Sequence, residues 1–352
     1  MELRIKKHLG TIIMFGGSIF FSMPNYADSY SFTTLTDTNT VPGSNYPVYA
    51  DHINNSGVVV GILAGNLYGQ GFIYNGSNFS SAQGGNNLGI NNNGQLTGSN
   101  LFCYGYCVAG TNISGFISNG SSITSFKEPN AYMGPTYSLG INDNGVVAGY
   151  FVVNHPNDIY NPGQANVGNN GYIYDGKTYT TIDVPNSSET IATDINNNGE
   201  VVGYFGNATG IHGFEYNLVT INLGFMGLPL FMQLPSYTTI NDPNATSGTW
   251  ITGINNNGEI SGYYNDATGA HGFIYNGSTY TTIDDPLAVA GTTKITSIND
   301  SRQIVGQFTD SLGITQSFIA SPTAVPLPSS LWLFASAPLG FLGFNSRKTI
   351  QK

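Results

Sequence analysis

The chain has 352 residues, and only 9% of them are charged, against roughly 25% in a typical globular protein. Its 46 glycines, 22 tyrosines and 20 phenylalanines make a composition suited to turns and β-strands. A formal net charge of -10 argues against nucleic-acid binding, because contacts to phosphate groups need Lys and Arg.

Residues 1–27 have the features of a secretory signal peptide. Three basic residues among the first eight precede an apolar stretch over residues 9–23, and the segment ends with the small residue Ala27. We expect cleavage near Ala27. The alternative is an uncleaved anchor, which Gly16, Gly17 and the shortness of the apolar stretch disfavour.

Residues 28–323 contain six copies of one unit. The phrase Ile-Asn-x-x-Gly recurs at intervals of 37 to 59 residues, and a second phrase, Gly-Phe-Ile-Tyr, follows each copy. The first phrase begins at Ile53, Ile90, Ile141, Ile195 and Ile254, with a degenerate sixth copy at Ile298. Internal repeats of this length indicate a propeller or a solenoid.

The fifth copy shows the expected fold of the unit. Four short stretches, 250–255, 259–264, 272–275 and 279–284, alternate apolar and polar residues as strands do. Asn-Gly pairs join the first two strands and the last two, and Asn-Gly accepts the positive φ angles of tight hairpin turns. Each unit is therefore predicted to be a four-stranded antiparallel meander.

The position of one strand predicts how the array ends. The last unit stops after its third strand at Phe318, whereas an isolated fourth-strand sequence stands at residues 31–37. Pairing these two segments would close a ring and remove the exposed sheet edges. We therefore predict an all-β, six-bladed β-propeller closed by pairing of the N-terminal strand with the last blade; the rival is an open β-solenoid.

The repeats also resemble a known family. His212-Gly213-Phe214 and His271-Gly272-Phe273 are similar to the His-Ala-Phe phrase of the HAF family of extracellular repeats, with Gly in place of Ala. The resemblance implies an exported, propeller-like protein and brings no established activity with it.

Two cysteines and several carboxylates are candidates for chemistry. Cys103 and Cys107 are predicted to form a local disulfide at a loop tip, since two cysteines cannot complete a zinc site. Acidic residues shortly before proline either form a partial ring of ligands for Ca²⁺ or cap their own turns. These residues are Glu128, Asp183, Asp242 and Asp285.

One further stretch resembles the opening of a calcium loop. Asp194, Asn196 and Asn198 have the spacing of the first EF-hand ligands, but Phe205 occupies the twelfth position, where a Glu is needed. The alternative is an ordinary tight turn. No cofactor is expected, and Ca²⁺ is the only candidate metal.

The histidines are His52, His155, His212 and His271. His212 and His271 occupy equivalent places in two repeats, which the fold alone explains. His155 lies in a long loop with Asp158 and Tyr160, where it is either a solvated side chain or a group for acid–base chemistry.

The insertion at residues 217–235 is uncharged and apolar. Met226, Phe231 and Met232 either form a patch that docks a partner or a lipid surface, or belong to a loop folded back over its blade. Pro229 and Pro235 exclude a membrane-spanning helix.

Residues 324–352 combine a Pro-Leu-Pro motif, an apolar run over residues 331–344 and a basic end. The segment resembles the PEP-CTERM sorting signal of Gram-negative, exopolysaccharide-making bacteria, with Leu327 where that motif has Glu. The resemblance implies a short hydrophobic helix and processing by an exosortase. The matching residues are Pro326, Leu327, Pro328, Trp332, Gly340, Gly343, Arg347 and Lys348.

These features predict an exported protein of the outer surface or extracellular matrix, anchored transiently or permanently by its C-terminal segment. We expect a non-catalytic binding or structural module whose partners are an exosortase, exopolysaccharide or surface proteins, and no nucleic acid. The alternative is a secreted propeller hydrolase or lyase acting on polysaccharide at the central pore. A third class is adhesion through the insertion.

Overall fold

The computed structural model describes residues 12–15, 18–21, 29–36, 47–64, 70–82, 86–101, 113–131, 134–153, 168–222 and 231–323. The chain divides into two compact units, Phe32–Ser321 and the combined ends, Met1–Ser31 with Pro322–Lys352. In the ends, β1 (Ile12–Phe15) and β2 (Ser18–Phe21) form an antiparallel pair within the predicted signal peptide. No helix among these residues is long and apolar enough to cross a membrane.

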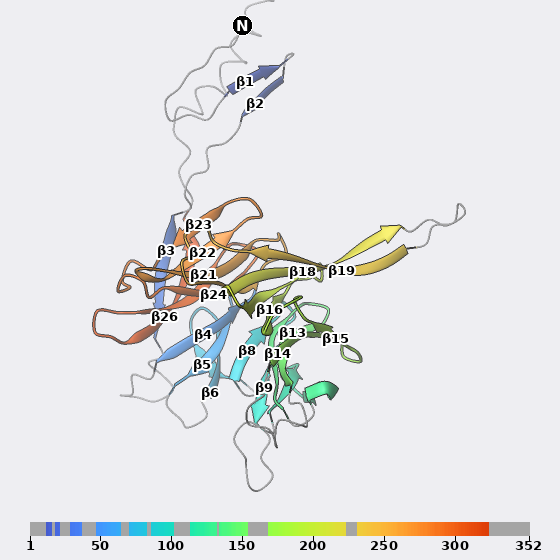
Figure 1. Ribbon diagram of the computed structural model, residues 1–352. Coiled ribbons are helices and arrows are strands. Elements are labelled where there is room, and N and C mark those ends of the chain that lie inside the picture. The colour runs from blue at the N-terminus through green and yellow to red at the C-terminus, as the bar shows by residue number, and fades with distance from the viewer. Residues whose placement is uncertain are drawn as a thin grey trace, which may run out of the picture. The chain divides into compact units, whose positions relative to one another are not determined.

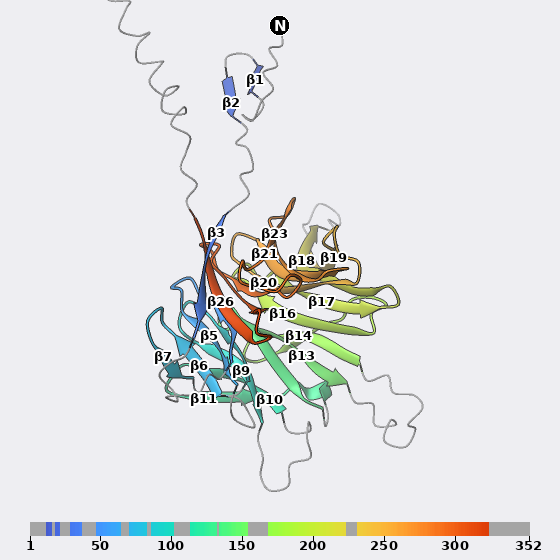
Figure 2. The ribbon, with the colours of Figure 1, turned by 90° about the vertical axis from the view of Figure 1, so that its left-hand side faces the viewer.

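The unit Phe32–Ser321 is built of six four-stranded antiparallel sheets, which we call blades 1–6 (Figures 1 and 2). Blades 1–5 each use four consecutive strands, innermost first. Blade 1 has β4 (Val48–Ile53), β5 (Val59–Leu63), β6 (Gln70–Tyr74) and β7 (Phe79–Ser81); blade 2 has β8 (Asn86–Ile90), β9 (Leu96–Leu101), β10 (Ile113–Ser118) and β11 (Ile123–Phe126). Blade 3 has β12 (Thr136–Ile141), β13 (Val147–Val153), β14 (Gly168–Tyr174) and β15 (Tyr179–Ile182); blade 4 has β16 (Glu189–Ile195), β17 (Val201–Asn207), β18 (Gly210–Asn222) and β19 (Phe231–Ile240). Blade 5 has β20 (Gly248–Ile254), β21 (Ile260–Asp266), β22 (Gly269–Tyr275) and β23 (Tyr280–Ile283). A short 3₁₀ helix, η1 (Pro129–Ala131), follows β11.

Blade 6 confirms the predicted closure. Its strands are β24 (Lys294–Ile298), β25 (Ile304–Thr309) and β26 (Thr315–Pro322), and the outer place is taken by β3 (Tyr30–Leu35) from the start of the chain. The ring of Phe32 packs 5.3 Å from that of Phe318, and Leu35 is buried. The chain is therefore a six-bladed β-propeller, and the solenoid alternative is wrong.

The Asn-Gly turns have the predicted geometry. The glycine that ends the Ile-Asn-x-x-Gly phrase has a φ between 75° and 82° in blades 1–5. In the degenerate sixth copy, Arg302 takes the same left-handed conformation at φ 60°. These turns bring the inner two strands of each blade together on one side of the ring. The links from the second strand to the third, and from one blade to the next, leave from the opposite strand ends, which we call the side of the longer loops.

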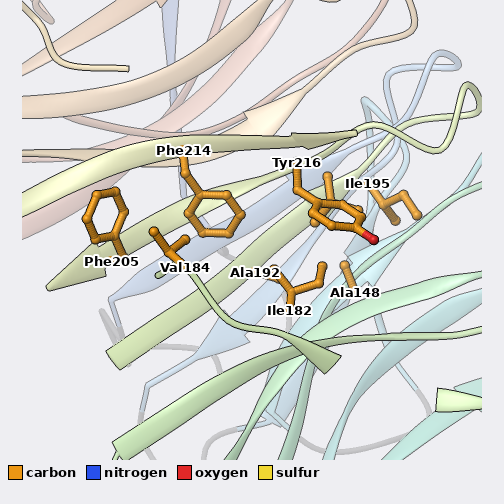
Figure 3. Close-up of a cluster of buried hydrophobic side chains, with 9 residues drawn as sticks. Ala148, Ile182, Val184, Ala192, Ile195, Phe205, Phe214 and Tyr216 are labelled. Atoms are coloured by element: carbon orange, nitrogen blue, oxygen red, sulfur yellow. The ribbon is translucent and has the colours of Figure 1, made fainter. Parts of the chain in front are cut away.

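The core lies between the blades. The aromatic residue of each Gly-Phe-Ile-Tyr phrase is wholly buried; these residues are Phe72, Phe116, Tyr172, Phe214, Phe273 and Phe318. Figure 3 shows one such contact, in which Phe214 and Tyr216 of blade 4 lie in a cluster with Ile182 and Ala148 of blade 3. The repeated apolar residues therefore stabilise the ring chiefly by burial between neighbouring blades.

The insertion in blade 4 is a hairpin. β18 and β19 continue past the Tyr216–Tyr237 pair, in register, as far as the Asn222–Phe231 pair. Figure 1 shows these two strands extending outward from the ring. Leu218 is 51% exposed and Met232 42%, so the prediction of a loop folded back over its blade is wrong. Met226 lies outside the described residues.

Several other predictions concern residues outside the described ranges. These are the disulfide between Cys103 and Cys107, the loop of His155, Asp158 and Tyr160, and the sorting segment. The sorting residues Pro326, Leu327, Pro328, Trp332, Arg347 and Lys348 all belong to this group.

Candidate functional site

A closed ring of hydrogen bonds surrounds the propeller axis on the side of the tight turns. The buried Asn of each Ile-Asn phrase donates its side-chain amide to the main-chain carbonyl of the equivalent Asn in the next blade, over 2.9 to 3.2 Å. Its side-chain oxygen accepts two main-chain N–H groups of its own turn, as Asn255 does from Asn257 and Glu259. The ring residues are Asn54, Asn91, Asn142, Asn196, Asn255 and Asn299. The repeated Asn therefore holds both its own turn and the neighbouring blade.

The next residue of each phrase forms a second ring. Its main-chain N–H donates to the side-chain oxygen of its counterpart in the next blade, over 2.7 to 2.9 Å. The members are Asn55, Asn92, Asp143, Asn197, Asn256 and Asp300. Each of the two aspartates also accepts the amides of both neighbouring asparagines, so their carboxylates are already occupied.

A small cavity of about 60 Å³ lies on the axis inside these rings, and His52 and Asp194 are among its lining residues. The two side chains come from blades 1 and 4, and Nε2 of His52 is 3.8 Å from Oδ1 of Asp194. β-bulges shift the register of both inner strands just before these residues. Three other blades have Gly89, Gly140 and Gly253 here, and blade 6 has Ser297. A side chain at Gly140 would collide with Asp194.

Neither ring nitrogen of His52 has a hydrogen-bond partner among the described residues, so its interaction with the nearby carboxylates is electrostatic. Burial alone would lower the pKa of His52, but contact with Asp194 and the charges of Asp194 and Asp51 outweigh it and raise the pKa. Burial raises the pKa of Asp51 to about 6, although the His52 charge and the N–H of Leu88 oppose this. Asp194 also accepts the N–H groups of Ile195 and Ile254. These contacts link blades across the axis and place Asp194 in a strand rather than in a calcium loop.

The carboxylates before proline cap their own loops. Glu128, Asp242 and Asp285 are buried, and each accepts an N–H group two or three residues further on. Asp183 is exposed and accepts the hydroxyl of Ser187. Within the described part of the chain, no three His, Cys, Asp or Glu residues are grouped so that they could hold a metal ion. The turn-capping interpretation therefore accounts for their contacts.

His212 and His271 have the same local partners in blades 4 and 5. Nε2 of His271 lies 2.7 Å from the hydroxyl of Thr268, and Nδ1 lies 2.7 Å from Oδ2 of Asp284. His212 contacts Thr209 in the same way but has Asn241 in the place of Asp284. Because the Thr268 hydroxyl also lies 2.7 Å from Oδ1 of Asp266, the cluster is a hydrogen-bonded clamp between two strands.

This clamp predicts a pH-dependent stability. Burial lowers the pKa of His271, but hydrogen bonding to Asp284 and the charges of Asp284 and Asp266 outweigh it, so the folded-state pKa is raised. Its stabilisation is complete below the unfolded value of about 6.5 and is lost as the pH rises through the raised folded value.

We expect Asp284→Asn, which reproduces the blade 4 arrangement, to remove about 0.5 to 1 kcal/mol at pH 6 and little at pH 9. Urea unfolding at both values measures this. An equal loss at both would contradict the ion-pair account.

A row of aromatic side chains lies on the inner two strands of blades 3–5, toward the side of the longer loops. Trp250 stacks on Tyr263 in blade 5, with centroids 5.1 Å apart and planes 7° apart, and Tyr137 stacks on Tyr150 in blade 3 at 4.7 Å. All four are partly exposed. They are cross-strand neighbours, because β20 pairs with β21 and β12 with β13 in that register.

Tyr204 of blade 4 is near both stacks. It is close enough to Tyr150 and to Tyr263 to contribute to the raised pKa of each. At the far end, Nζ of Lys294 in blade 6 lies 5.0 Å from the centroid of the Tyr263 ring. We call Tyr137, Tyr150, Tyr204, Trp250 and Tyr263 the aromatic arc; it crosses three successive blades.

The arc keeps its phenols neutral. Burial raises the pKa of Tyr263 to about 12, with a smaller contribution from Tyr204, and burial also raises the pKa of Tyr137 and Tyr204. The hydroxyl groups therefore remain hydrogen-bond donors at any pH the protein would ordinarily meet. Flat apolar faces beside neutral hydroxyls suit a ligand that is itself amphipathic and uncharged.

Neither the axial pair nor the arc is predicted from the sequence. A signal for the arc was present, because Tyr150, Tyr204 and Tyr263 each follow the second-strand glycine of their repeat. His52 and Asp194 gave no such signal, because they are 142 positions apart and only closure of the ring brings them together.

No family model matches the chain, and no curated protein matches it. Among solved structures, similarity extends to a protein provisionally described as a gluconolactonase, with 12% identity and a TM-score of 0.44 over 84% of this chain and 92% of that one. A Trypanosoma rangeli sialidase in complex with sialic acid has 10% identity and a TM-score of 0.41 over 93% and 64%. A Pyrococcus horikoshii acylaminoacyl peptidase has 7% and 0.41 over 86% and 55%. The chain thus spans less than two thirds of the length of the last two. Similarities this low do not strengthen the fold assignment, which follows from the pairing of the strands.

Proposed function

We propose that this propeller is a non-catalytic module of an exported surface protein, and that its aromatic arc binds neutral polysaccharide. The observation that carries the proposal is the two stacked aromatic pairs, with Tyr204 near both, on the side of the ring that bears the longer loops. Binding surfaces commonly lie among such loops on a rigid scaffold. The apolar C–H face of a sugar ring packs on an aromatic face, and the sugar hydroxyls pair with the phenols.

Charge favours a neutral ligand over an anionic one. Residues 28–323 contain four basic and nineteen acidic side chains, so the field around the propeller repels polyanions. Lys294 is next to the arc, but Glu189 is close enough to Tyr150 and Tyr204 for its charge to act on both. An uncharged glycan is not repelled by the acidic surface and does not require a charge to be buried.

The polar groups on the axis support a structural role rather than catalysis. His52 and Asp194 face each other at 3.8 Å, and the cavity that they line is only about 60 Å³, the size of a few water molecules rather than of a sugar residue. The aspartates of the second ring are held by amides. A hydrolase or lyase needs a carboxylate or imidazole beside the bound polymer, whereas none of the arc residues lines the cavity of His52 and Asp194.

Affinity electrophoresis through gels that contain a neutral β-glucan tests the proposal. We expect the glucan to retard the unmodified protein, and Trp250→Ala or Tyr137→Ala to weaken binding by about tenfold or more. Tyr49→Ala is the matched control, because Tyr49 takes the same place in blade 1 but pairs with Ile62 rather than with a second ring. Equal retardation of all variants would contradict the assignment, as would stronger retardation by anionic alginate.

We further propose that residues 324–352 act as a PEP-CTERM-like sorting signal that an exosortase processes after export. The order of the Pro-Leu-Pro motif, apolar run and Arg347-Lys348 supports this, because a hydrophobic segment followed by cations halts in the membrane. Intact mass in the native host is expected to show loss of the C-terminal segment, and Pro326→Ala with Pro328→Ala to prevent it. An intact tail in both forms would contradict processing.

A further inference from the structure

The hairpin of blade 4 leaves one strand edge without a partner. β17 pairs with β18 only as far as the Val201–Tyr216 register pair, whereas β18 and β19 run on together for six more pairs. Among the described strands, none lies against residues 217–222 on the side away from β19. We call this side of residues 217–222 the free β18 edge. Unpaired main-chain groups along such an edge are a template for another strand.

The two edges of the hairpin are not equivalent. Pro235 lies on the outer strand opposite Leu218, and a proline on an edge strand removes a donor and blocks strand addition. The free β18 edge has no proline, and its sequence Leu-Val-Thr-Ile is rich in residues that favour strands. The pairing chemistry therefore directs an added strand to β18.

The side chains around this edge are apolar and uncharged. Leu218, Val219, Met232 and Leu234 are between 39% and 51% exposed. Val219 and Leu234 are register partners on one face, and Met232 lies two residues from Leu234 on the same face. The chain has no charged residue between Glu215 and Asp242. The hairpin thus presents both an open hydrogen-bonding edge and an exposed apolar face.

We propose that the free β18 edge pairs with the same edge of a second copy of this chain, joining two hairpins into a four-stranded antiparallel sheet. Two-fold symmetry makes such a contact self-complementary, and the absence of charge lets two strongly acidic propellers meet through their extensions. A lipid surface is a poorer occupant, because an open strand edge would carry unpaired main-chain groups into hydrocarbon. Two short strands bury less area than a stable interface, so we expect a dissociation constant on the order of 10 µM.

Three full-length variants test the proposal by sedimentation between about 1 and 100 µM, a range that brackets this constant. In the first, the turn that joins Tyr275 to Tyr280, Asn-Gly-Ser-Thr, replaces residues 217–236 between Tyr216 and Tyr237. The second is Thr220→Pro. Pro235 has no N–H, so it cannot form a hydrogen-bonded pair with Leu218, and the N–H of Leu218 points away from β19. The direction of the N–H groups alternates along a strand. The N–H of Thr220, two residues further on, therefore also points to the free β18 edge. The third, Thr220→Val, keeps that donor and is the matched control.

We expect the unmodified chain and Thr220→Val to double in mass with rising concentration, and the turn replacement and Thr220→Pro to stay monomeric. All four proteins have the same termini, so association through the ends would be common to all. A monomeric unmodified chain would overturn the proposal. A Thr220→Pro variant that still dimerised would also overturn it, since it retains every exposed apolar side chain. Binding of the monomer to phosphatidylethanolamine–phosphatidylglycerol vesicles, abolished by the turn replacement alone, would assign the hairpin to lipid instead.

Discussion

A chain that begins at residue 37, and so lacks β3, is expected to have a free energy of unfolding about 5 kcal/mol lower than the complete chain. β3 fills the outer place of blade 6, where Leu35 is buried and Phe32 packs on Phe318. Without it, these contacts are lost and β26 becomes an open edge, which promotes aggregation. Urea unfolding, followed by the light scattering of each form, measures both effects.

Point variants of β3 separate closure from simple shortening of the chain. Leu35→Ala removes a buried side chain and is expected to cost about 2 to 4 kcal/mol. Thr33→Ala, at an exposed residue of the same strand, should cost less than about 0.5 kcal/mol. Addition of a peptide of residues 29–36 to the shortened chain should restore part of the lost stability. Equal stability of the shortened and complete chains would contradict closure by β3.

Replacement of Asn255 by Ala is expected to lower the free energy of unfolding by about 3 kcal/mol. The side chain accepts the N–H groups of Asn257 and Glu259 and donates to the carbonyl of Asn299 in the next blade. Alanine leaves the carbonyl of Asn299 buried and the two N–H groups partly buried without these partners, which costs more than the net value of the bonds themselves. Denaturant unfolding of the purified variant gives the loss directly.

Asn257 supplies the control in the same turn. It is exposed, and its amide makes a single 3.2 Å bond to the carbonyl of Asp300, so Asn257→Ala should cost less than about 1 kcal/mol. If the two variants lost the same stability, the hydrogen bonds of the ring would contribute no stability beyond that of blade packing.

Most of the fold follows from local signals in the sequence. The Asn-Gly turns fix the hairpins through positive φ angles at residues such as Gly258, and the displaced strand at residues 31–37 predicts the partner of β26. The predicted strand bounds of the fifth unit are within three residues of β20–β23. These signals are strong because each of them occurs several times in the chain.

The hairpin and the axial pair did not follow from local signals. Residues 217–235 are apolar on both faces near their ends, so their alternation was weak, and only the continued register with β19 defines them as strands. His52 was considered only as a lone histidine. Its contact with Asp194 depends on ring closure and on two β-bulges that shift the facing residues, neither of which a sequence pattern displays.

The arc illustrates an intermediate case. Gly203 is needed because a side chain there would meet the carbonyl of Ile191 at the bulge, and Tyr204 follows it directly. The same Gly-Tyr pair recurs at Tyr150 and Tyr263. The repeat therefore marks the positions of three arc residues. The stacking of Tyr150 on Tyr137 and of Tyr263 on Trp250 depends on the cross-strand register, which the repeat does not show.

The fluorescence of Trp250 reports whether a neutral glycan binds at the aromatic arc. The chain has two tryptophans, Trp250 and Trp332, so Trp332→Phe leaves the arc residue as the sole indole. We expect titration with a neutral β-glucan to shift the emission of Trp250 to shorter wavelength, saturably, and to protect it from quenching by acrylamide. Emission and quenching that remained unchanged at concentrations where the glucan retards the protein would show that the polysaccharide binds elsewhere.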